Sequence, residues 1–138
     1  MITSTWKPLD PDIRAFLTDF ERRGAQPDSD SGDQFAEAFL VGDPNHATVL
    51  ERTVLVASLP SRRAMFDKAG VRPARCVDAA QLDLDDHYVL LTTDWDADRE
   101  HEAPLRLEST FLLRRGSTGV SVLAYLNHRD IAAVLAAP

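Results

Sequence analysis

The segment 104–114 alternates between apolar and polar side chains with a period of two residues. One set of side chains is mostly apolar and consists of Leu105, Leu107, Ser109, Phe111 and Leu113. The interleaved set is mostly polar or charged and consists of Arg106, Glu108, Thr110, Leu112 and Arg114. Because successive side chains of a strand point to opposite faces of a sheet, this alternation predicts a strand that buries one face.

Three other segments in the carboxyl-terminal half also have strand patterns. We predict these strands over 75–84, 87–96 and 120–127. Asp85 and Asp86 supply a turn between the first two strands, and the glycine-containing segment 115–119 closes a hairpin. A parallel crossover needs a dozen or more residues, so these short connections predict antiparallel pairing.

The amino-terminal part of the chain has a helical period instead. Asp10 followed by Pro11 is typical of a helix start, because an aspartate cap accepts backbone N–H bonds and proline fits the first helical position. The apolar stripe of this helix is Ile13, Phe16, Leu17 and Phe20, spaced i, i+3, i+4 and i+7. Gly24 is expected to end the helix in the left-handed conformation.

Two more helices are expected before the strands, with an ambiguous segment between them. Ser31 and Gln34 form a capping box for the first of these. Its buried face is expected to hold Phe35, Ala38 and Phe39. The segment 47–59 fits a strand, or equally a short strand followed by a helical turn. Pro60 suits the start of the next helix and Gly70 suits its end.

Helices followed by a strand meander are typical of an α+β domain, with the helices on one face of an antiparallel sheet. A final short helix is expected to bear Ile131, Val134 and Leu135 on one side. The 138 residues match one domain over 1–138, and 44% hydrophobic residues suffice for a core. A net charge of -7 argues against binding to nucleic acid or an anionic membrane, because both require a positive face.

No targeting or membrane segment is predicted. The first eight residues lack a basic segment followed by an apolar one, so we expect no signal peptide. Apolar stretches such as 54–57 fall far below the roughly 18–20 residues of a membrane helix. We therefore expect a soluble cytoplasmic protein. The single cysteine, Cys76, cannot form an intrachain disulfide.

Three blocks of sequence carry a resemblance to known proteins. The block 106–115 with Gly119, and the block 122–128, look like the last hairpin of SnoaL-like proteins of bacteria. The block 59–66 resembles the third helix of the same proteins. With the order of the predicted elements, the chain resembles the nuclear transport factor 2-like superfamily along nearly its whole length.

This resemblance implies a curved antiparallel sheet, wrapped against the amino-terminal helices into a cone with an interior pocket. It also implies a homodimer formed through the outer face of the sheet. The superfamily includes ketosteroid isomerase, scytalone dehydratase, polyketide cyclases, and modules that only bind or assemble. Because one fold hosts so many activities, the function must be argued from the site.

Five residues are candidates for lining such a pocket: Trp95, Tyr125, Asn127, Phe66 and Thr110. An inward Trp95 would offer a flat wall to a ring-bearing ligand, and otherwise it packs in the core or a dimer contact. In a regular strand Asp94 and Asp96 lie on the face opposite Trp95.

Tyr125 and Asn127 share one face of the strand 120–127. The same face is expected to hold Ser121 and Leu123. A phenol and an amide on an apolar face are groups that orient a ligand in a pocket. The alternative is a buried tyrosine bonded to the backbone and an asparagine that caps the final helix.

The sequence contains no complete catalytic or metal-binding constellation. The first helix has no tyrosine, so the catalytic trio of ketosteroid isomerase cannot be placed. The histidines have no metal-ligand spacing, and we expect no metal and no cofactor; they are His46, His87, His101 and His128. His128 suits a general base at the rim of the cone or a surface position. Arg62 and Arg63 suit an anion site or a solvated helix face.

Three functional hypotheses follow. The first is a binding module for a small, partly apolar molecule. The second is a cofactor-independent isomerase, cyclase or dehydratase that uses acid–base chemistry on a hydrophobic substrate. The third is a structural or regulatory dimer whose cone is filled by side chains. A large open cavity with converging polar groups favours the first two hypotheses, and a packed cone favours the third.

Overall fold

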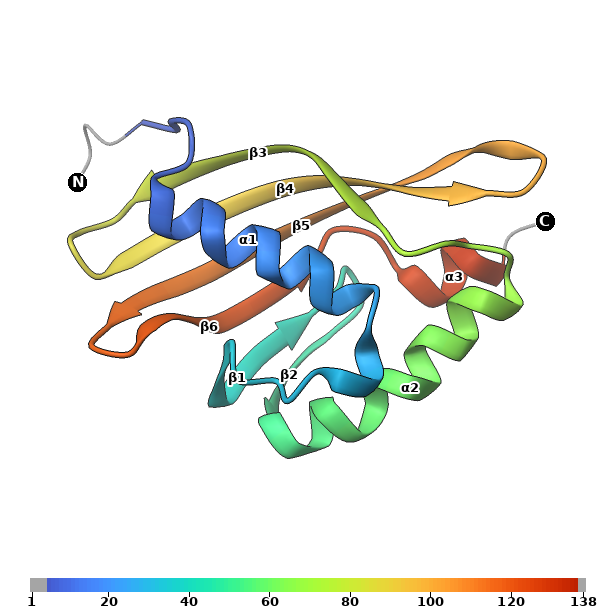
Figure 1. Cartoon of the computed structure of the whole chain (residues 1–138), viewed down its shortest axis with the longest axis horizontal. Helices are drawn as coiled ribbons and strands as arrows, with labels where there is room; N and C mark the ends of the chain where they lie inside the picture. Colours follow the sequence, from blue (N-terminus) through green and yellow to red (C-terminus); the bar gives the residue numbers. More distant parts are fainter. Residues whose placement is uncertain (1–4, 137–138) are drawn as a thin grey trace.

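A computed structural model describes residues 5–136, in which helices pack on one face of a twisted six-stranded sheet (Figure 1). The helical elements are α1 (Pro11–Gly24), the short 3-10 helix η1 (Pro27–Ser29), α2 (Arg52–Lys68) and α3 (Ile131–Ala136). The strands are β1 (Phe35–Gly42), β2 (Ala47–Glu51), β3 (Arg75–Asp83), β4 (Tyr88–Arg99), β5 (Glu102–Gly116) and β6 (Gly119–Asn127). The predicted α+β architecture is confirmed.

The sheet has the order β2-β1-β6-β5-β4-β3. Strands β3 to β6 form the antiparallel meander that their short connections predict. In contrast, β1 runs parallel to β6, so the expectation of a purely antiparallel sheet is wrong at this pair. The two strands come from distant parts of the chain, and no short connection constrains their relative direction.

The helix expected after Ser31 is a strand, β1. The spacing of Phe35 and Phe39 explains the error, because residues four apart share a face in a strand as well as in a helix. Both rings are buried on the inner face. Gln34 forms no capping box, since its side-chain amide donates a hydrogen bond to the carbonyl oxygen of Phe16, at 3.1 Å.

The ambiguous segment 47–59 contains β2 and the first half of α2. The helix therefore begins at Arg52, and Pro60 lies inside it rather than at its start. Pro60 is exposed, so its ring lies on the solvent side of the helix. Gly70 does follow the end of α2 and has a left-handed φ of 73°.

Helix α1 has the bounds expected from its sequence, but the capping interactions at its two ends differ from the predicted ones. The Asp10 side chain makes no capping hydrogen bond, and its carboxylate accepts hydrogen bonds from Arg115 and Gln81 instead. Gly24 is the last helical residue, and Ala25 forms the cap in a right-handed conformation. Gly24 therefore does not adopt the left-handed backbone conformation that the sequence predicts.

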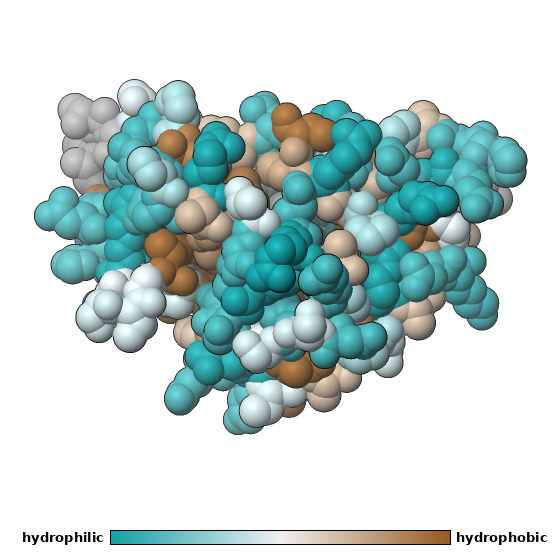
Figure 2. Space-filling view, in the orientation of Figure 1, coloured by the Kyte–Doolittle hydropathy of each residue, from teal (hydrophilic) through white to brown (hydrophobic). Residues whose placement is uncertain are grey.

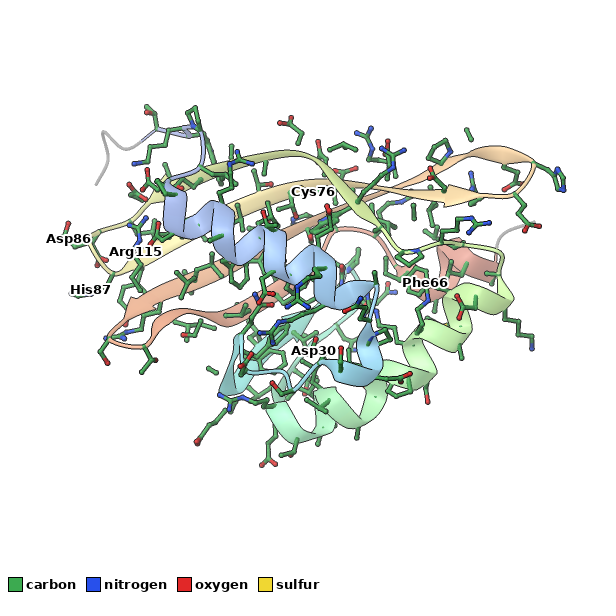
Figure 3. The ribbon with its side chains drawn as sticks, in the orientation of Figure 1. Asp30, Phe66, Cys76, Asp86, His87 and Arg115 are labelled. Atoms are coloured by element: carbon green, nitrogen blue, oxygen red, sulfur yellow. The ribbon has the colours of Figure 1, made fainter. Side chains whose placement is uncertain are left out.

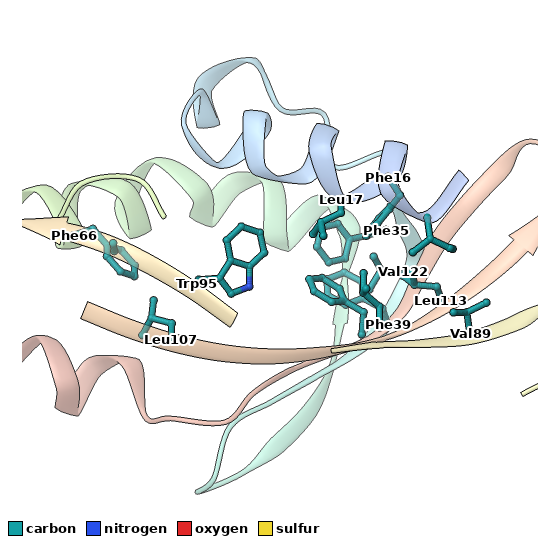
Figure 4. Close-up of a cluster of buried hydrophobic side chains, with 14 of the residues drawn as sticks. Phe16, Leu17, Phe35, Phe39, Phe66, Val89, Trp95, Leu107, Leu113 and Val122 are labelled. Atoms are coloured by element: carbon teal, nitrogen blue, oxygen red, sulfur yellow. The ribbon is translucent and has the colours of Figure 1, made fainter. Parts of the chain in front are cut away.

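The core lies between α1 and the inner face of the sheet (Figure 4). The predicted inward set of β5 is buried, including Leu105, Leu107, Ser109, Phe111 and Leu113. In the view of Figure 2, which faces α1, hydrophilic residues cover most of the surface and apolar residues form small separate groups.

Residues 5–136 contain neither a membrane-spanning helix nor a metal-binding cluster. None of the helices there is both long and apolar enough to cross a membrane. The same residues bring together no group of three His, Cys, Asp or Glu side chains that could hold a metal ion.

Candidate functional site

A pocket of about 200 Å³ lies between the helices and the inner face of the sheet. Strands β4, β5 and β6 contribute Trp95, Leu107, Ser109, Tyr125 and Asn127 to its lining. The helical side is formed by Phe20 of α1 together with Leu55, Leu59 and Phe66 of α2. Most of this lining is apolar or aromatic, as is typical of sites for small organic molecules.

Four of the five predicted pocket residues meet in this hollow: Trp95, Tyr125, Asn127 and Phe66. Thr110 does not, because its neighbours Ser109 and Phe111 both point inward and it must point to the outer face. There its hydroxyl oxygen lies 2.7 Å from Nε2 of His128. The placement of Thr110 in the pocket is therefore wrong.

Phe20 is the centre of an aromatic cluster beside the pocket. Its ring lies edge-on to Phe111 with centroids 5.0 Å apart, and edge-on to Tyr125 at 5.9 Å. The centroid of Trp95 lies 6.1 Å from that of Phe20. Edge-to-face pairs of this kind add stability beyond the area that they bury, so the aromatic side of the pocket is firmly held.

Trp95 points inward, and its indole N–H is already satisfied. It donates to Oγ1 of Thr93 at 2.8 Å and to Oγ of Ser109 at 3.1 Å. Trp95 can therefore offer a ligand its ring but no free donor. As the alternation predicts, Asp96 faces the other way, where its carboxylate accepts a hydrogen bond from Nε of Arg106 at 2.6 Å.

The hydroxyl of Tyr125 and the side-chain amide of Asn127 are polar groups with no hydrogen bond to any other residue in 5–136. Neither alternative interpretation holds. The tyrosine makes no hydrogen bond to the backbone, and α3 is capped by Asp130, whose Oδ1 accepts from Ala133 N at 3.1 Å. Both groups are half-buried at the pocket, so each is free to bind a ligand.

The inward face of β6 differs from the predicted set because of an irregularity in its pairing. Tyr125 pairs with Phe111, but Leu113 pairs with Val122, so the strand gains one residue between these two pairs. The extra residue reverses the alternation. Val122 is therefore buried on the inner face together with Tyr125, and the expected companions Ser121 and Leu123 are not.

Four arginines line the pocket, which the sequence did not predict as a group: Arg23, Arg62, Arg63 and Arg72. Arg23 is neutralised by Asp19, Asp30 and Asp33. Arg63 pairs with Asp67 and donates to the carbonyl oxygen of Val71. Figure 3 shows two other lining residues, Asp30 just after η1 and Phe66 on α2. Arg62 and Arg72 are exposed and have no such partner among residues 5–136.

The pocket has little of what acid–base catalysis requires. None of the four histidines, all of which the structure describes, contributes to its lining. Its carboxylates are engaged: Glu21 accepts the backbone N–H of Cys76, and Asp30 accepts from Arg23 and from the backbone of Gly32. Burial raises the pKa of the nearby Cys76 thiol to about 11, which leaves it protonated and unreactive at neutral pH.

A second hollow of about 260 Å³ adjoins the first. Its lining comes from the ends of β1 and β6, from the turn after β1 and the start of β2, which contribute His46 and Thr48, and from α2 and α3. Arg62 and Asn127 belong to both hollows. These two side chains therefore lie at the boundary between the two spaces.

No family model matches this sequence, and no curated protein matches it. The fold, however, has counterparts among solved structures. A nuclear transport factor 2-like protein of unknown function from Shewanella oneidensis MR-1 matches with a TM-score of 0.69 at 12% identity, over 85% of this chain and 96% of that chain. A cystatin-like protein of unknown function from Nostoc punctiforme PCC 73102 matches with a TM-score of 0.66 at 10% identity, over 86% and 89%.

Aln2 from a Streptomyces species matches with a TM-score of 0.60 at 19% identity, over 95% of this chain and 100% of that chain. The protein described here therefore has the nuclear transport factor 2-like, or cystatin-like, α+β fold, as its resemblance implied. Identities this low relate folds and do not transfer a function.

Proposed function

We propose that this protein binds a small, partly apolar molecule in the pocket between α1, α2 and the sheet. The observation that carries the proposal is the pair of free polar groups, the Tyr125 hydroxyl and the Asn127 amide, beside the aromatic and aliphatic side chains that form most of the lining. Pockets orient their ligands with a few convergent polar groups of this kind.

The size of the hollow limits the ligand. Its volume of about 200 Å³ lies below the range of roughly 300–1,000 Å³ that is typical of drug-sized ligands. An apolar cavity of about 150 Å³ is large enough for benzene. The best fit is therefore one ring, or a branched chain of similar size, with one short polar substituent.

The acidic side chains of the pocket favour binding over catalysis, because both of them are already hydrogen-bonded within the protein. The pocket's Glu21 and Asp30 are each committed to hydrogen bonds within the protein. A general base must be able to reach a proton on the substrate, and the histidines that suit this role lie elsewhere. The structure gives no comparable support to an isomerase, cyclase or dehydratase.

The experiment is a titration of the ¹⁵N-labelled protein with benzamide, benzyl alcohol and benzoate, followed by NMR. We expect shifts at pocket residues, and affinities for benzamide that are about 2- to 10-fold weaker in Tyr125→Phe and in Asn127→Ala, the effect of one lost hydrogen bond. Thr110→Val removes a hydroxyl on the outer face and is the matched control. The proposal is wrong if none of the three compounds shifts the pocket resonances.

We also propose that the outer face of the sheet pairs with a second copy of the chain. An apolar row crosses all six strands through paired positions: Val49, Leu40, Ala124, Leu112, Leu90 and Leu82. Val49 is 68% exposed and Leu40 is 39% exposed, so this end of the row is open to solvent. Contiguous apolar surface of this kind is typical of an interaction site.

Charges on the same face favour a particular arrangement. Arg114 on one side of the row has no ion pair within residues 5–136, and Glu108 on the other side has none either. A two-fold axis along the row would place Arg114 of one copy on the same side as Glu108 of the other, since it reverses the strand direction. An axis parallel to the strands would bring like charges together.

Light scattering tests the dimer. We expect a mass of twice 15.3 kDa for the natural chain and of 15.3 kDa for Leu112→Glu. Val54→Glu alters another exposed apolar residue, on α2 and outside the row, and should leave the dimer intact. A monomeric natural chain, or a dimeric Leu112→Glu variant, would show that this face is not the interface.

A further inference from the structure

Two arginines at the pocket, Arg62 and Arg72, have guanidinium groups that no carboxylate within residues 5–136 binds. Among residues 5–136, four arginines make neither an ion pair nor a side-chain hydrogen bond; they are Arg14, Arg62, Arg72 and Arg114. Arg62 and Arg72 both line the pocket described above, although they come from different segments of the chain. The chain has 22 acidic residues and 15 basic ones, so guanidinium groups without a carboxylate partner are unusual in it. Two of them at one hollow indicate a site that attracts a negatively charged ligand.

The charges around these two arginines do not cancel them. Arg23 and Arg63, the other arginines of the lining, have their own carboxylates. Asp30 is held by Arg23, so Glu21 is the remaining acidic group of the lining, and it accepts a backbone hydrogen bond. The lining itself therefore holds four arginines against two carboxylates, and the further carboxylates nearby are bound to Arg23 and Arg63 rather than to Arg62 or Arg72.

Arg62 is better placed than Arg72 to bind a ligand. Its guanidinium carbon lies 5.7 Å from the centroid of the Phe66 ring, a cation–π contact that restrains the side chain without using its hydrogen-bond donors. Arg62 also lines both hollows, as does Asn127. A ligand group at this boundary can meet a guanidinium and an amide N–H at once.

We propose that the ligand is a small organic carboxylate, whose ring or branched chain fills the pocket and whose carboxylate binds Arg62, with Arg72 adding to the attraction. This inference rests on the proposed binding function and specifies its ligand class. The planar guanidinium fork matches a carboxylate, and hydrogen bonds between ions are stronger than neutral ones. A doubly charged phosphate fits less well, because Glu21 also lines the pocket.

The test compares benzoate with benzamide, which have nearly the same shape and differ in charge. Calorimetry with the full chain should give an affinity for benzoate at least about 10-fold higher than for benzamide. In Arg62→Gln this preference should fall about 10-fold, and in Arg72→Gln by a smaller factor. Arg14→Gln removes another partnerless arginine, one on α1 outside the pocket, and should keep the full preference.

The possible outcomes separate the two proposals. If benzamide binds as tightly as benzoate, the pocket binds neutral molecules and the carboxylate inference is wrong. If Arg14→Gln weakens benzoate as much as Arg62→Gln does, the effect is one of overall charge and the inference is also wrong. If benzamide, benzyl alcohol and benzoate all fail to bind, the proposed binding function fails as well. Arg62 makes no hydrogen bond that the fold requires, so its variant should fold normally.

Discussion

The ring of Tyr125 lies parallel to the ring of Phe111, with centroids 4.8 Å apart and an angle of 11° between the planes. The two residues are paired directly across β5 and β6. Phe20 of α1 packs edge-on against both rings. The aromatic part of Tyr125 therefore belongs to the core, while its hydroxyl makes no bond that holds the fold together.

Because the ring and the hydroxyl have these separate roles, two substitutions should affect stability to very different extents. Tyr125→Phe keeps the stacked ring and should change the free energy of unfolding by less than about 0.5 kcal/mol. Phe111→Ala removes a fully buried ring and should cost about 3–5 kcal/mol. Urea denaturation measures both values. A large loss of stability in Tyr125→Phe would mean that the hydroxyl has a structural partner, and the pocket assignment would then need revision.

Much of the fold was predictable because its signals are local. The alternation over 104–114 identified the buried face of β5, and the stripe from Ile13 to Phe20 identified that of α1. Tyr125 and Asn127 were assigned to one face of β6, and the structure places both at the pocket. In each case one short segment contained the whole pattern.

The remaining features depend on distant parts of the chain. Phe35 and Phe39 fit a helix or a strand equally well, and the segment is a strand because it pairs with β2 on one side and with β6, from the far end of the chain, on the other. The extra residue of β6 changes which side chains share a face, and no residue type in the sequence marks it. Arg23 and Arg72 reach one pocket through the folding of segments that are far apart in the sequence.

A second prediction concerns the hydrogen bonds behind Trp95. Its indole N–H donates to two buried hydroxyls, those of Thr93 and Ser109. Trp95→Phe keeps an aromatic ring but removes that donor. The two hydroxyls keep the hydrogen bond between them, at 2.8 Å, so the expected cost is that of a lost hydrogen bond, about 0.5–1.5 kcal/mol. Chemical denaturation should show this loss. Trp6→Phe, at a residue that is 49% exposed, is the control and should have nearly the natural stability.

A third prediction concerns acid stability. Arg115 binds the carboxylates of Asp10 and Asp12 at the end of the sheet away from Phe66 (Figure 3). Hydrogen bonds from Arg115 lower the pKa of both carboxyl groups below the ordinary value of 3.8. A lowered pKa in the folded state means that the unfolded chain binds more protons at acidic pH. The stabilisation is therefore complete above about pH 5 and is lost as the pH falls below about 4.

The variant Arg115→Met should reveal this contribution. At pH 7 its free energy of unfolding should be lower than that of the natural chain, and the difference should shrink toward zero as the pH falls below about 4. Asp85 provides an internal control, because backbone N–H groups of Tyr88 and His87 lower its pKa without Arg115. Some acid sensitivity should therefore persist in the variant. A difference that stays constant down to about pH 2 would contradict the ion-pair explanation.

The last prediction concerns Pro60, which lies inside α2. Proline has no backbone N–H, so the carbonyl oxygen of Val56 lacks its usual helical donor, and a proline inside a helix costs about 3 kcal/mol. Pro60→Ala should restore the hydrogen bond and raise the free energy of unfolding, by about 1–3 kcal/mol once the greater freedom of the unfolded chain is counted. Because the same helix carries Arg62 and Phe66, affinity for benzoate should be measured alongside the urea midpoint. Higher stability with unchanged affinity would show that the proline is not needed to position these residues. Higher stability with weaker binding would show that the proline shapes the helical side of the pocket, and lower stability would contradict the prediction.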